Sequence, residues 1–209
     1  KYDYNEVLTG YDMSVIFNIV FLVGNIGLMG LTMTIIEKRS TFTSKRDQIL
    51  PINDFNKFIL NIFSSVILTI VITLVILCLN YSLYPITLQF NILHIPAFII
   101  VLFNFFAIGY IIATLNISPR TAQAMGILLF FICLFFSGLV IPFDDSKPIL
   151  NDISVISPFR VSINFMTAVT DLENIFTYSK YLIIMLIYTI LNLIIIIMKG
   201  RIGKEIIQR

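Results

Sequence analysis

The sequence predicts an all-α protein that crosses a membrane several times. Of its 209 residues, 58% are hydrophobic and only 12% are charged, whereas a soluble domain carries about twice that charged fraction. The hydrophobic residues gather in runs of about 20 residues, the length that a helix needs to cross a hydrocarbon core about 30 Å thick. The net charge of +2 is spread over the intervening segments, so no nucleic-acid partner is predicted.

Five runs are long and apolar enough to be membrane spans. We expect these spans at residues 13–36, 57–80, 95–115, 121–140 and 181–198. The whole chain, residues 1–209, is therefore expected to form a single transmembrane domain.

The basic residues predict how the spans are oriented. Segment 37–57 carries five Lys or Arg residues, whereas segment 80–94 carries none. Arg120 stands in the next turn, and four more basic residues lie in the C-terminal tail. Loops rich in Lys and Arg stay in the cytoplasm, so we expect a multi-pass protein of the cell membrane with Lys1 outside and Arg209 inside.

The outer segment, residues 141–180, is expected to contain two short helices. Apolar residues recur at helical spacing in residues 149–156 and again in residues 161–169. Short amphipathic helices of this kind lie at the membrane interface or re-enter the membrane. We therefore expect two of them to cap the outer face.

Polar residues recur along the first predicted span. Asn18, Asn25 and Thr32 are spaced seven residues apart, with small glycine residues beside them. Polar side chains within a span usually face protein or water. Two interpretations stay open, a seam of helix packing and the lining of a substrate path. The spans carry no ionisable residue at mid-depth, which argues against a proton relay or an ion-coupled carrier.

The sequence holds no motif of a catalytic, nucleotide-binding or metal-binding site. Cys78 and Cys133 lie in apolar runs, so no disulfide framework is predicted. His94 lies near the outer end of the third span, where a capping or interfacial role is favoured over catalysis. We expect a chain that is not an enzyme and has no cofactor or metal of its own.

Segment 135–160, FFSGLVIPFDDSKPILNDISVISPFR, resembles the C-terminal signature of the ABC-2 type permeases, the membrane subunits of many bacterial ATP-binding cassette exporters. Ser137 and Gly138 match the end of a family span, and Pro148 and Pro158 match the starts of two outer helices. Segment 118–126 is similar to the family's entry into that span. Segment 37–57 is similar to a family loop in which charged residues are followed by a Leu and Pro element.

The resemblance implies a permease subunit that works with other chains. Family members are dimers of permease subunits, each docked on a separate ATPase subunit that binds ATP and Mg. The family has six spans, so this chain is expected to be N-terminally incomplete and to lack the first. Segment 37–57 is expected to couple the ATPase to the membrane through Glu37, Lys38, Arg39, Phe42, Lys45, Arg46, Asp47, Leu50 and Pro51.

The expected function is export of a hydrophobic or amphipathic substrate, such as a drug or an antimicrobial or toxin-like peptide. The substrate path between two permease subunits would be lined by Asn18, Asn25, Thr32, Gly126, Phe130, Cys133 and Ser137. An outer gate would include Gly138, Pro142, Pro148 and Pro158. The alternative is a structural or assembly subunit without a transport path. A membrane enzyme such as an acyltransferase is disfavoured, because it would need His and acidic residues at one membrane face.

Overall fold

The computed structural model describes residues 10–40, 54–85, 91–115, 117–138, 152, 154–170 and 178–207. Throughout these ranges the regular elements are helices, so the prediction of an all-α membrane protein is confirmed. In chain order they are α1 (Gly10–Gly24), the π-helix η1 (Asn25–Gly30), α2 (Leu31–Ser40), α4 (Asp54–Leu83), α5 (His94–Ala113), α6 (Pro119–Phe135), α8 (Pro158–Thr170) and α9 (Ser179–Ile207).

Four helical stretches in the described part of the chain are long and apolar enough to cross a membrane. They cover residues 10–37, 62–83, 94–113 and 179–198, and the first of them joins α1, η1 and α2. The fourth predicted span, residues 121–140, corresponds to α6, which is a shorter apolar helix.

The bounds of α6 differ from the predicted ones at both ends. The helix begins at Pro119, because the Ser118 hydroxyl caps it by accepting a hydrogen bond from the Thr121 backbone N–H at 3.2 Å. It ends at Phe135, and Gly138 then takes a left-handed conformation with φ 74°. A left-handed glycine after the last turn is a common helix stop. The helix thus ends before the end of the predicted span, residues 121–140, of which the last two residues lie outside the described ranges.

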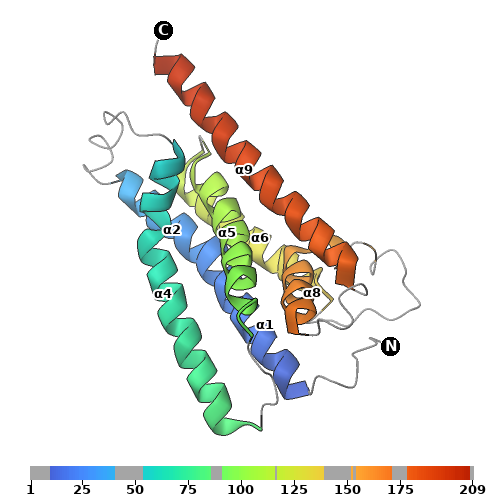
Figure 1. Ribbon diagram of the computed structural model, residues 1–209. Coiled ribbons are helices and arrows are strands. Elements are labelled where there is room, and N and C mark those ends of the chain that lie inside the picture. The colour runs from blue at the N-terminus through green and yellow to red at the C-terminus, as the bar shows by residue number, and fades with distance from the viewer. Residues whose placement is uncertain are drawn as a thin grey trace.

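The long helices alternate in direction, as Figure 1 shows. The end of α2, the starts of α4 and α6 and the end of α9 lie at one end of the bundle. The end of α4, the start of α5 and helix α8 lie toward the other end. The helix ends that flank segments 41–53 and 116–118 therefore share one end of the bundle.

Helix α8 lies inside the bundle rather than across its outer face. Ten of its thirteen residues are buried, because it packs against α1, α5, α6 and α9. Two polar contacts tie its start to neighbouring segments: Arg160 donates to the Ser154 hydroxyl, and the Ser157 hydroxyl donates to the Cys133 carbonyl at 2.6 Å. The short helix expected over residues 161–169 is therefore present, and its burial fits the re-entrant form rather than a helix that lies across the outer face. Half of the other expected helix, residues 149–156, lies outside the described residues.

Helices α5 and α6 both approach the backbone of η1 closely, in the middle of the first span. A methyl group at Gly109 of α5 would lie 2.0 Å from the Gly27 carbonyl oxygen, and one at Gly126 of α6 would lie 2.8 Å from the Leu28 carbonyl oxygen. The Thr32 hydroxyl donates to the Leu28 carbonyl at 2.7 Å and lies 3.2 Å from that of Gly109. Short π-helical segments inside α-helices are rare and often occur at functional sites.

A buried polar cluster joins α5 to α9. The Asn104 amide donates to the Thr189 hydroxyl at 2.9 Å, and its oxygen accepts from the Asn192 amide at 3.0 Å. Asn104 and Asn192 are both buried. Helix pairs in membranes commonly use such bonds, because hydrocarbon offers no alternative partner.

We expect Asn192→Leu to destabilise the protein by about 1 kcal/mol, because it leaves the Asn104 oxygen buried without this partner. The double variant Asn104→Leu/Asn192→Leu should be less destabilised than the sum of the two single variants, since removing both partners leaves no orphaned group. Thermal unfolding of the four proteins in detergent measures this coupling. Strict additivity would show that the two amides do not interact.

Candidate functional site

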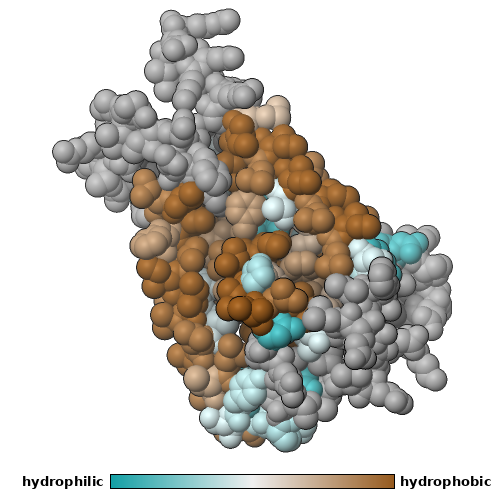
Figure 2. Space-filling model, viewed as in Figure 1, coloured by the Kyte–Doolittle hydropathy of each residue, from teal (hydrophilic) through white to brown (hydrophobic). Residues whose placement is uncertain are grey.

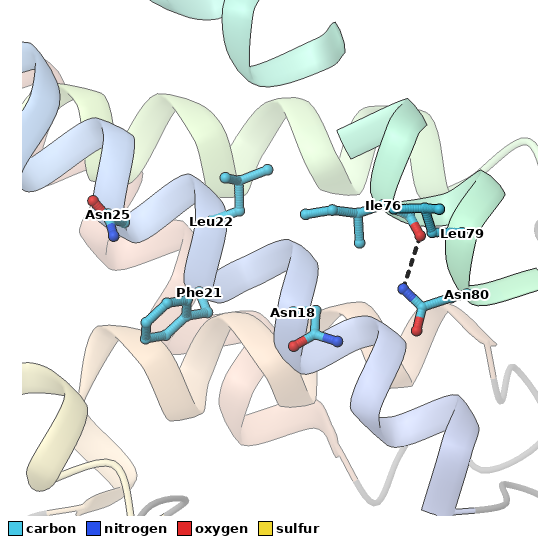
Figure 3. A pocket seen from close by; sticks show the side chains of 7 residues that line it. All are labelled: Asn18, Phe21, Leu22, Asn25, Ile76, Leu79 and Asn80. Atoms are coloured by element: carbon cyan, nitrogen blue, oxygen red, sulfur yellow. Dashed lines mark hydrogen bonds between the residues drawn. The ribbon is translucent and has the colours of Figure 1, made fainter. Parts of the chain in front are cut away.

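A groove between the first span and α4 brings three amide side chains together. It has a volume of about 360 Å³. Figure 3 shows Leu22 and Ile76 reaching toward each other from the two helices. The full lining consists of Asn18, Phe21, Leu22, Asn25, Ile76, Leu79 and Asn80. The groove therefore has apolar walls with amides along its length.

Two of these amides have no partner within the described part of the chain. Asn18 is half-buried and Asn25 is exposed, and neither side chain hydrogen-bonds a described residue. The third amide, Asn80, donates to the carbonyl of Ile76 in its own helix at 2.8 Å. An amide facing hydrocarbon without a partner costs several kcal/mol. This face of the first span therefore requires water, a substrate or another chain against it.

An aromatic cluster behind the groove holds α1 against α6 and α8. The ring centroids of Phe21 and Phe130 lie 5.6 Å apart, and those of Phe130 and Phe159 lie 5.5 Å apart in an edge-to-face arrangement. Such pairs stabilise beyond their buried area. Phe130 and Phe159 are both buried, and this packing holds Phe21, which lines the groove, against α6.

One end of α1 is also held to α4. The rings of Tyr11, in the first turn of α1, and Tyr84, directly after α4, stack at 5.4 Å between centroids. The helices are thus joined at this end, and the groove lies further along between residues 18–25 and residues 76–80.

The predicted substrate-path residues fall into two groups. Asn18 and Asn25 border the groove. The others lie within the packed interior of the single chain or at its edge: Thr32, Gly126, Phe130 and Ser137 are buried, and Cys133 is half-buried. The wall that α4 contributes, above all Asn80, was not singled out from the sequence. The sequence feature that could have identified Asn80 is its position, since it is an amide at the end of the predicted span 57–80.

The predicted coupling and gate residues lie mostly where the structure is not described. Glu37 is exposed near the end of α2, and Lys38 and Arg39 belong to the same helix. Gly138 is buried after α6, and Pro158 begins α8. The remaining residues lie outside the described ranges: Phe42, Lys45, Arg46, Asp47, Leu50, Pro51, Pro142 and Pro148.

His94 joins the start of α5 to the end of α8. It is buried, its Nδ1 lies 2.9 Å from the Asn91 side-chain oxygen, and its Nε2 lies 3.1 Å from the Thr170 hydroxyl. The Asn91 amide in turn donates to the Val169 carbonyl at 3.0 Å. The described residues contain no group of three or more His, Cys, Asp or Glu that could hold a metal ion. These contacts give His94 a structural role.

A family model described as ABC-2 type transporter matches residues 3–170. The matched range is well over half of the chain and runs from α1 through α8. No curated protein and no solved structure matches the chain.

Proposed function

Because the chain belongs to the ABC-2 type transporter family, we propose that it is the permease subunit of an ATP-driven exporter. Its cargo is a hydrophobic or amphipathic molecule, such as a drug or an antimicrobial or toxin-like peptide. The observation that carries this proposal is the groove between the first span and α4, in which Asn18 and Asn25 have no partner in the described part of the chain.

The chemistry of the groove supports an amphipathic cargo. Phe21, Leu22, Ile76 and Leu79 supply apolar walls, and the amides offer both donors and acceptors without a charge. An uncharged lining of this kind recognises a molecule that carries apolar groups beside a few hydrogen-bonding groups. The distribution of basic residues supports a cytoplasmic position for segment 37–57, and export is the direction that the resemblance to the ABC-2 type exporters implies.

A separate ABC ATPase subunit would bind ATP and Mg, and the permease would be a dimer. Family membership supports both partners in general terms. In such a dimer the unpaired amides would face the second permease subunit or the water and cargo between the two subunits. Segment 37–57 connects α2 to α4. It would therefore transmit the movement of the ATPase to these two helices in the cell membrane.

The test is the variant Asn18→Leu/Asn25→Leu in the complete complex with its ATPase. We expect transport of a lipophilic dye or a labelled amphipathic peptide into inside-out vesicles to fall about tenfold, since each amide contributes about 0.6–1 kcal/mol to binding. Assembly should be retained. The matched control is Thr34→Val, because that hydroxyl already bonds to the Gly30 carbonyl of its own helix at 2.9 Å.

Two outcomes separate the candidate functions. Loss of transport with the complex intact supports the transport path. The complex could instead dissociate while each remaining complex transports at the wild-type rate. The face with Asn18 and Asn25 would then be a contact surface, as expected of a structural or assembly subunit.

A further inference from the structure

Helix α9 continues past its membrane span as a basic helix. The span, residues 179–198, has no charged residue between Lys180 and Lys199. Twenty residues of helix rise by about 30 Å, which is the thickness of the hydrocarbon core. The helix then continues without a break to Ile207, and Figure 1 shows that it extends past the other helices at this end of the bundle. Helix α9 lies beyond residues 3–170, the range that the family model matches.

The last turn of this span is open to lipid. In the most apolar window of α9 only 22% of the residues are buried, against 56% in α5, and the side of α9 visible in Figure 2 is hydrophobic along most of the span. Ile196 is buried, whereas four residues around it are 43–56% exposed: Ile194, Ile195, Ile197 and Met198. These four positions are spread over about 160° of the helix circumference. The bundle therefore covers only part of α9 where the helix leaves the hydrocarbon core.

Three basic residues follow the span within the same helix: Lys199, Arg201 and Lys204. Their positions lie about 1.5, 4.5 and 9 Å past Met198 along the helix axis. The headgroup region on each side of the hydrocarbon core is about 5–8 Å thick, so these positions extend across the headgroup layer. The same stretch of helix contains one acidic residue, Glu205, and therefore keeps an excess of positive charge.

We propose that this basic end of α9, residues 199–204, binds the phosphates of anionic phospholipid headgroups. Arginine offers paired donors to a phosphate, and lysine offers a point charge. Each basic residue next to a span strengthens the attraction to an anionic lipid surface about fivefold.

An ATPase surface is the other partner that a basic segment could have. Lipid is favoured because the basic positions begin directly after Met198, at the depth of the headgroups, and because the last turn of the span is exposed to lipid. In the expected orientation these headgroups belong to the cytoplasmic leaflet. The proposal concerns a different part of the chain from the Asn18 and Asn25 groove, and it does not depend on transport.

The test uses the purified full chain in phosphatidylcholine nanodiscs that contain a low mole fraction of a photoreactive lipid. The probes are phosphatidylglycerol and phosphatidylcholine, each with a diazirine close to the ester group, and peptide mass spectrometry measures their adducts. The start of α5, around the exposed Ile95, is the internal reference, because segment 80–94 carries no Lys or Arg. We expect the ratio of phosphatidylglycerol to phosphatidylcholine adducts at the end of α9 to exceed the reference ratio about fivefold or more.

The deciding variant is Arg201→Gln/Lys204→Gln, which removes two charges outside the hydrocarbon core. We expect its adduct ratio at the end of α9 to fall about fivefold or more, toward the reference ratio, while the melting temperature in detergent stays the same. Arg201→Lys/Lys204→Arg, the matched control, exchanges the side chains, keeps both charges and should keep the wild-type ratio.

Two results would overturn the proposal. One is a wild-type ratio at the end of α9 that equals the ratio at the start of α5. The other is an Arg201→Gln/Lys204→Gln variant that keeps the wild-type ratio, and if that variant also loses its ATPase from the complex, the basic end of α9 is an ATPase contact instead.

Discussion

Replacing Gly109 by alanine is expected to destabilise the folded protein by about 3 kcal/mol, at the upper end of what overpacking usually costs. The added methyl group would lie 2.0 Å from the carbonyl oxygen of Gly27 and 3.0 Å from its carbonyl carbon. These are backbone atoms of η1, which cannot rotate aside as a side chain would. Helix α5 would have to move away from η1, and the contact of the Thr32 hydroxyl with the Gly109 carbonyl would be lost.

The melting temperature of the detergent-purified protein measures this effect. For a chain of this length, a loss of about 3 kcal/mol corresponds to a fall of about 6–12 °C. Gly30→Ala is the matched control within η1, because its methyl group would meet nothing closer than the Ile26 side chain at 3.7 Å. That variant should be neutral or gain up to about 1 kcal/mol of helix propensity. Equal tolerance of both substitutions would contradict the close approach of α5 to η1.

The long helices could be located from the sequence because uncharged apolar runs leave few alternatives in a membrane. Their ends were harder to place. The first span was predicted to begin at residue 13, after the charge of Asp12, yet the helix begins at Gly10. Asp12 lies in the first turn of α1, where an acidic residue suits the positive end of the helix dipole. A charged residue at the end of an apolar run therefore does not mark the end of the helix.

The π-helix explains why only part of the predicted polar stripe faces the groove. Asn18, Asn25 and Thr32 share one face if the α-helical repeat is unbroken. The i→i+5 bonding of η1 interrupts that repeat between Asn25 and Thr32. Asn18 and Asn25 accordingly border the groove, whereas Thr32 turns inward to the Leu28 and Gly109 carbonyls. The register break lies where α5 and α6 approach the backbone of η1, and a single sequence does not reveal that approach.

Contacts between distant segments were also beyond sequence reasoning. Gly109 is a single small residue within an apolar run and carries no local signal. Its importance comes from what lies opposite, the backbone of η1. Helix α8 is a similar case, because its amphipathic pattern predicts a short helix at the interface or re-entering the membrane, but does not identify the four neighbouring helices that cover it.

Reversing two charges in the segment between α2 and α4 is expected to uncouple the complex. The variant Lys45→Glu/Arg46→Glu should lower substrate-stimulated ATP turnover about tenfold or more, because placing like charges together at an interface costs several kcal/mol, and 1.4 kcal/mol is already tenfold. The reason is topological: α2 and α4 meet this segment at the end of the bundle where α6 starts and α9 ends. In the proposed orientation an ATPase in the cytoplasm reaches the permease at that end.

The measurement is vanadate-sensitive ATP hydrolysis by the purified complex, with and without cargo, together with the amount of ATPase that remains bound. Lys180→Glu is the matched control, since Lys180 is exposed at the start of α9, at the opposite end of the bundle. Raising the salt concentration should weaken the wild-type complex in the same direction as the double reversal, because exposed charges are screened. Unchanged assembly and unchanged stimulation in the double variant would show that the basic residues of segment 37–57 set orientation alone. The coupling contact would then have to be sought at the other helix ends on that side, the start of α6 and the end of α9.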